Sequence, residues 1–68
     1  MDADRVELLR GLFAAVTEVL ENAHEIAILG QNAHRRPASL LKAAEKLSAA
    51  ARDLRTLTDA VTALARPT

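Results

Sequence analysis

One short interruption constrains the fold of this 68-residue chain more than any other feature. The segment from Gly30 to Pro37 separates two long stretches in which apolar residues recur at spacings of three and four. That spacing is typical of amphipathic helices, and proline favours the first turn of a new helix. The sequence therefore predicts a helix over about residues 4–29, a turn over about 30–37 and a second helix over about 38–65.

Residues near the expected helix ends fit this division. Asp2 or Asp4 is suited to cap the first helix, because a side-chain carboxylate accepts hydrogen bonds from free backbone N–H groups. Gly30 is expected just past the end of that helix in the left-handed conformation. The alternative is a helix that runs one turn further, to about His34. Arg36 precedes a proline and is therefore expected in extended geometry, and Pro67 is expected to stop the second helix.

Two helices joined by so short a turn are expected to lie antiparallel, side by side. The whole chain, residues 1–68, is thus interpreted as one all-α domain, an antiparallel helical hairpin. Alanine and leucine supply most of its hydrophobic residues, which suits long helices, and the absence of cysteine excludes disulfides.

Each predicted helix carries an apolar seam with heptad spacing. The large candidate core and interface residues are Val6, Leu9, Phe13, Val16, Leu20, Leu40, Leu47, Leu54, Leu57, Val61 and Leu64. A second row, Leu12, Val19 and Ile26, lies beside the seam of the first helix. The apolar face is therefore wider than one neighbouring helix covers, which favours a four-helix bundle.

A chain of this size buries only a modest core by itself. Pairing two hairpins buries both wide faces at once, and a two-fold dimer is the commonest closed assembly. We therefore expect a homodimeric four-helix bundle. The alternative is a hairpin that packs against a different protein.

Closing the hairpin at residues 33–34 predicts that residues whose numbers sum to about 67 face one another. Phe13 would then meet Leu54, and Leu20 would meet Leu47. Charge supports adjacent helices, because residues 1–29 carry a net charge of −4 and residues 30–68 carry +4. Glu21 is expected near Lys46, and Glu25 near Lys42.

Glu21 and His24 have the Glu-x-x-His spacing, which places a carboxylate and an imidazole on one side of a helix. The pair resembles the motif of ferritin-like di-iron bundles, which implies a metal-binding bundle as an alternative function. Leu20 and Ala23 occupy the seam, so Glu21 and His24 are expected at its flank or in solvent. We therefore predict no metal and no cofactor, with Glu21 and His24 kept as candidate ligands.

The turn supplies a small cationic tip made of His34, Arg35 and Arg36. Such a tip can contact a carboxylate or a phosphate group. Two arginines fall below the density of a convincing basic patch, so a solvated loop is the simpler interpretation.

The layout resembles that of Rop-type helix-hairpin dimers, which implies an RNA-binding regulator as a further alternative. The acidic first helix and the neutral total charge argue against nucleic acid. No nucleophile with a matching base occurs, so we predict no enzyme. The expected role is a cytoplasmic, non-enzymatic protein–protein interaction or regulatory module, with a homodimer as the expected partner, a second protein as the alternative, and no membrane.

Overall fold

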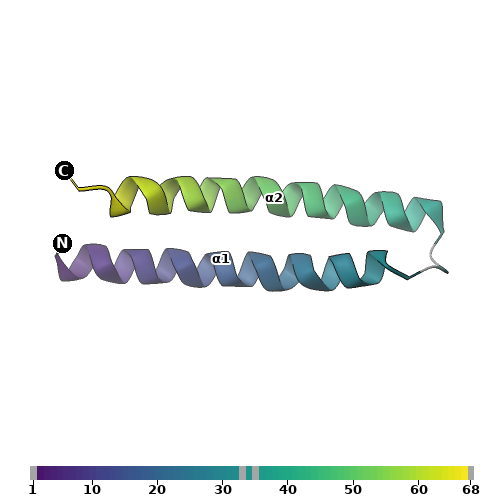
Figure 1. Ribbon diagram of the computed structural model, residues 1–68, viewed down its shortest axis with the longest axis horizontal. Coiled ribbons are helices and arrows are strands. Elements are labelled where there is room, and N and C mark those ends of the chain that lie inside the picture. The colour runs from purple at the N-terminus through teal and green to yellow at the C-terminus, as the bar shows by residue number, and fades with distance from the viewer. Residues whose placement is uncertain (1, 33, 35, 68) are drawn as a thin grey trace.

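The computed structural model of the protein describes residues 2–32, 34 and 36–67. Two helices, α1 (Ala3–Gly30) and α2 (Pro37–Ala65), lie side by side and run in opposite directions (Figure 1). The hairpin is a narrow rod of 51 × 15 × 11 Å. The prediction of an all-helical hairpin is confirmed over the described residues, and both helices extend beyond the predicted bounds by one residue at one or both ends.

Asp2 caps α1, and this selects one of the two aspartates that the sequence offered. Its carboxylate accepts a hydrogen bond from the backbone N–H of Arg5 at 2.7 Å. Asp4 lies within the first turn, where its negative charge is stabilised by the helix dipole.

The prediction of a left-handed Gly30 is wrong. Gly30 is the last residue of α1 and its φ is negative. The chain continues in right-handed geometry at Gln31, whose N–H donates to the carbonyl of Ala27 at 3.2 Å and to that of Ile28 at 3.1 Å. The helix thus ends by tightening its last turn, which needs no glycine.

Both prolines act on the residue that precedes them. Arg36 and Arg66 are extended, with ψ of 150° and 136°, as expected from the steric clash with the proline ring. Pro37 is therefore the first helical residue of α2. The Arg36 carbonyl accepts from the N–H groups of Ser39 at 2.9 Å and Leu40 at 3.0 Å, which starts the helix without a side-chain cap.

Half-buried residues mark the seam along which the two helices touch. On α2 they recur at spacings of three and four, namely Ala43, Leu47, Ala50, Leu54, Leu57, Val61 and Leu64. On α1 the corresponding row is Leu9, Leu12, Val16, Val19, Ala23 and Ile26. Among the described residues only Ala50 reaches the buried class, at 9% exposure. The seam holds the hairpin together but leaves it almost without a core.

The predicted register of the hairpin is corrected. Phe13 is 57% exposed and Leu20 is 50% exposed, so they do not pack against Leu54 and Leu47 within the hairpin. One cleft is lined by both Val19 and Ala50, and another by both Ile26 and Ala43. Facing residues therefore have numbers that sum to about 69. This register places Val16 level with Leu54.

We predict that removing the cap of α1 lowers the stability of the protein. Asp2→Ala leaves the N–H of Arg5 without its acceptor and is expected to reduce the free energy of unfolding by about 1 kcal/mol. Urea denaturation at a fixed chain concentration measures this. Asp2→Asn is the matched control and should retain most of the stability; an equal loss in both variants would contradict a capping role.

We also predict that Gly11→Ala stabilises the protein. Gly11 lies within α1, its φ is negative, and a Cβ there meets no atom within 4 Å. Replacing an exposed helical glycine by alanine gains about 1 kcal/mol. Gly30→Ala, at the end of the same helix, should gain less because that turn frays. Thermal unfolding compares the three proteins, and a lower melting temperature for Gly11→Ala would contradict this view of α1.

Candidate interaction surface

The seam divides the surface of the hairpin into two sides. One residue turns the helix by about 100°, so residues before and after a seam position project to opposite flanks. Asn22 precedes seam residue Ala23, and Lys46 precedes Leu47. Both line the same cleft. Residues that precede seam positions therefore share one side of the hairpin, and residues that follow them share the other.

We name these two sides after one residue of each. The Lys46 face consists of Leu8, Gly11, Ala15, Glu18, Asn22 and Glu25 from α1 with Lys42, Lys46, Ala49, Asp53, Thr56, Ala60 and Ala63 from α2. The Phe13 face consists of Arg10, Phe13, Thr17, Leu20, His24 and Ala27 from α1 with Ala44, Ser48, Ala51, Arg55, Thr58, Thr62 and Ala65 from α2.

Charge distinguishes the two faces. The Lys46 face carries five charged side chains, which are Glu18, Glu25, Lys42, Lys46 and Asp53. The Phe13 face carries no carboxylate and no lysine, and its fixed charges are the two arginines Arg10 and Arg55. Burial under a partner would therefore remove fewer charges from water on the Phe13 face.

Both of those arginines are already paired within their own helix. Arg10 donates to the Glu7 carboxylate at 3.2 Å, and Arg55 Nε donates to the Asp59 carboxylate at 3.1 Å. These are the two side-chain ion pairs found among the described residues. All four side chains are well exposed, so each pair contributes little to stability, but each neutralises an arginine of the Phe13 face.

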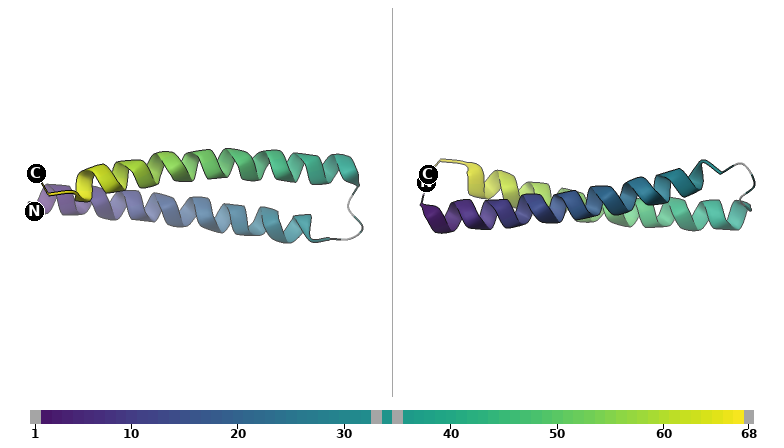
Figure 2. Two further views of the ribbon diagram at one scale, coloured as in Figure 1. Left: turned by 45° about the horizontal axis from the view of Figure 1, so that its top comes forward. Right: turned by 90° about the horizontal axis from the view of Figure 1, so that it is seen from below.

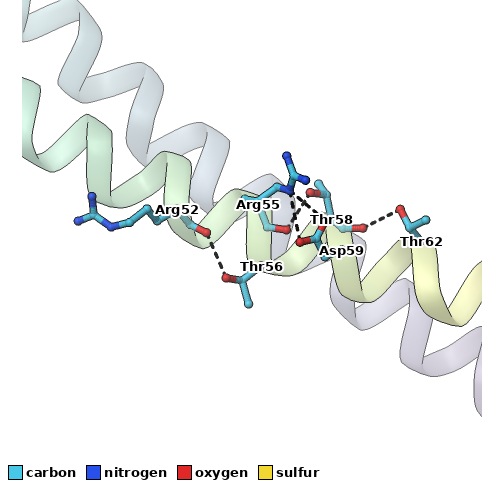
Figure 3. A network of polar contacts seen from close by, with 6 residues as sticks. All are labelled: Arg52, Arg55, Thr56, Thr58, Asp59 and Thr62. Carbon is cyan, nitrogen blue, oxygen red and sulfur yellow. Dashed lines mark hydrogen bonds and ion pairs between the residues drawn. The ribbon is translucent and has the colours of Figure 1, made fainter.

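The threonines of the Phe13 face have no free hydroxyl donor. Thr17 donates to the carbonyl of Phe13 at 3.1 Å. Thr58 donates to that of Arg55 at 3.1 Å, and Thr62 to that of Thr58 at 2.9 Å (Figure 3). A hydroxyl that bonds its own helix loses little when it is covered. The threonines of the Phe13 face are thus compatible with an interface.

The structure does not bring the predicted interhelical charge pairs together. Neither Glu21 with Lys46 nor Glu25 with Lys42 forms an ion pair in the described part of the chain. In the observed register Asn22, rather than Glu21, lies beside Lys46 in the cleft. Glu21 is one helical position further round and points away from α2.

The candidate metal ligands Glu21 and His24 are both exposed. His24 follows a seam residue and lies on the Phe13 face, whereas Glu21 lies on the outer side of α1. Within the described residues no group of three His, Cys, Asp or Glu side chains is close enough together to hold a metal ion. One hairpin thus provides this pair with no third protein ligand.

The candidate recognition tip lies at the end of the rod opposite the two chain ends (Figure 1). The N–H of His34 donates to the Asn32 side-chain oxygen at 2.9 Å, which fixes the start of the turn. His34 and Arg36 are exposed, and Arg35 lies outside the described residues. The described tip therefore offers one exposed arginine and one exposed imidazole.

The remaining predicted core and interface residues divide between the seam and the surface. Leu40 is 39% exposed at the first turn of α2, where it lines the cleft near the turn. Large exposed apolar residues also occur away from the Phe13 face, at Leu8, Ile28, Leu29 and Leu41. Along the described parts of α1 and α2, no stretch has the length and hydropathy of a membrane-spanning helix.

Comparison of the chain with protein-family models, with curated proteins and with solved structures gives no match.

We predict that the Arg55–Asp59 pair adds little to the stability of the fold. Both side chains are exposed in the single hairpin, so at a chain concentration low enough to keep each hairpin separate a double-mutant cycle of Arg55→Gln and Asp59→Asn should give a coupling energy of about 0.5 kcal/mol or less. Urea unfolding of the four proteins supplies the cycle. The cycle of Asp53→Asn with Arg55→Gln is the control and should give no coupling. A coupling above about 2 kcal/mol would show that the pair is not a solvated surface contact.

Proposed function

We propose that this protein is a small, non-enzymatic protein–protein interaction module whose hairpins pair through their Phe13 faces into a homodimeric four-helix bundle. The observation that carries the proposal is the near absence of a core, since only Ala50 is buried among the described residues. A seam of half-buried side chains gives modest hydrophobic stabilisation. A second hairpin supplies the cover that the first one lacks.

The surface area supports an interface of ordinary size. The chain exposes 5432 Å², whereas a compact monomer of its 7.3 kDa would expose about 4,200 Å². The excess is roughly 1,200 Å² by the same relation. A standard protein–protein interface buries about 800 Å² on each partner, so one interface fits within this excess.

The Phe13 face is the better side for that interface. Phe13 and Leu20 are large side chains that remain about half exposed, and covering the exposed half of each would contribute about 1 kcal/mol. The threonine donors are satisfied internally and the arginines are paired. The Lys46 face would instead place five charged side chains under the partner, at a large desolvation cost.

The distribution of titratable groups supports an interaction role rather than catalysis. Each aspartate, glutamate, histidine and lysine in the described part of the chain is exposed. Acid–base catalysis depends on such groups converging in a cleft that shifts their protonation. The cleft near Lys42 has lysines as its titratable lining residues, and the second cleft has Lys46 and Asp53, both of which are exposed to solvent.

Light scattering at micromolar concentration tests the assembly, and we expect the mass of a dimer. A folded monomer under these conditions would contradict the proposal.

A pair of matched variants tests the face. Leu20 on the Phe13 face and Leu8 on the Lys46 face are 50% and 54% exposed in the hairpin. The same substitution at either position should therefore change the stability of the single hairpin by a similar amount. Leu20→Asp removes one buried leucine from each copy and is expected to raise the dissociation constant by at least about 100-fold. Leu8→Asp should leave it within a few-fold. Sedimentation equilibrium measures both, and equal effects would contradict use of the Phe13 face.

A further inference from the structure

We infer that the second copy packs with its turn at the same end of the rod, so that α1 of each protomer lies on α2 of its partner. This inference rests on the proposed dimer and specifies its topology. Two hairpins facing each other through one side have two symmetric choices. Either α1 lies on the partner's α2 with both turns at one end, or α1 lies on the partner's α1 with the turns at opposite ends.

The first argument is charge. Residues 1–29 carry −4 and residues 30–68 carry +4, so the two halves of each chain attract each other. Packing α1 on the partner's α2 places each acidic helix between two helices of the basic half. The opposite choice places the two acidic helices side by side, where like charges repel.

The second argument is the size of the facing side chains. A two-fold axis parallel to the rod leaves heights unchanged. The sum of about 69 that holds within the hairpin therefore also relates α1 to the partner's α2. Leu20 then lies level with Ser48 and Ala51 of the second copy, and Ala27 lies level with Ala44. Leu20 thus meets small side chains and Ala27 meets another alanine, so no two large side chains oppose each other at these levels.

The same register gives Phe13 a suitable partner. It lies level with Arg55 of the second copy, whose guanidinium is neutralised by Asp59 and can stack on the aromatic ring. In the other arrangement, the large residues Phe13 and Leu20 would pack against each other on one side of the bundle. On the other side Ala51 would then lie level with Arg55, and Ala44 with Thr62. The large apolar side chains would thus be gathered on one pair of helices instead of lying opposite small ones.

The topology brings Arg36 of both copies to the same end. Arg36 is exposed, and repulsion between exposed charges is screened over about 10 Å at 0.1 M salt. The residues of the Phe13 face extend over most of the rod. Their packing against the partner therefore outweighs the repulsion between the two Arg36 side chains at the tip.

Distances between nitroxide labels test the topology, because the chain has no cysteine and each variant therefore carries one label per protomer. The positions are Gln31 near the turn, Ala63 near the chain ends and Glu18 at mid-length, all of them exposed. We expect short distances, about 20–30 Å with the label arms, at all three positions, because neighbouring helix axes lie about 8–10 Å apart and the two copies of one helix lie diagonally across the bundle, about 11–14 Å apart.

Opposite turns give a different pattern. Gln31 would be separated from its counterpart by about 40 Å along the rod and Ala63 by about 30 Å, at 1.5 Å per residue from mid-length, while Glu18 would stay close. That result would overturn the inference and leave the proposed dimer intact. The absence of any coupling between chains at Glu18, together with a monomeric mass in light scattering, would overturn both.

Discussion

The structure depends on one constraint, which is that two helices can bury only the strip along which they touch. In this hairpin the strip is a row of leucine, valine, isoleucine and alanine side chains from each helix, interleaved at spacings of three and four. Figure 2 shows the two helices lying side by side and crossing at a shallow angle, as this kind of packing requires. Because each helix has a single neighbour, apolar residues outside the strip stay at the surface. Phe13 and Leu20 are in this position for purely geometric reasons.

The polar side chains around Phe13 and Leu20 are arranged in a way that reduces the cost of covering them. Each arginine of that side has a carboxylate on its own helix, and each threonine hydroxyl bonds a backbone carbonyl of its own helix. Such local contacts add little to the stability of an exposed helix. Their importance is that they leave few charges and donors unsatisfied when water is removed. A helix surface can thus be rich in threonine and still be compatible with burial.

Much of the fold could be predicted from the sequence, and the errors have identifiable causes. The helix ends were predicted to within about one residue because Asp2 and Pro37 act locally. The sequence of α1 does not decide which of two apolar rows contacts α2, because the row of Leu12 and Val19 is as regular as that of Phe13 and Leu20. The choice depends on the register and the crossing angle of the two helices, which the sequence of one helix does not determine. Gly30 was misjudged because Gln31 continues in right-handed geometry. The Phe13 face could not be identified from the sequence, because it combines residues from both helices. Its lack of carboxylates becomes visible only when the structure shows which side of α1 adjoins which side of α2.

Both chain ends lie at the same end of the rod, away from the turn (Figure 1). This arrangement has a mechanical consequence. A force that pulls the two ends apart acts perpendicular to the seam, so the contacts between the helices break one layer after another, beginning near Leu64. Each layer bears the force only after the layer before it has broken. The same contacts loaded lengthwise, from one end of the rod to the other, would share the force and resist together.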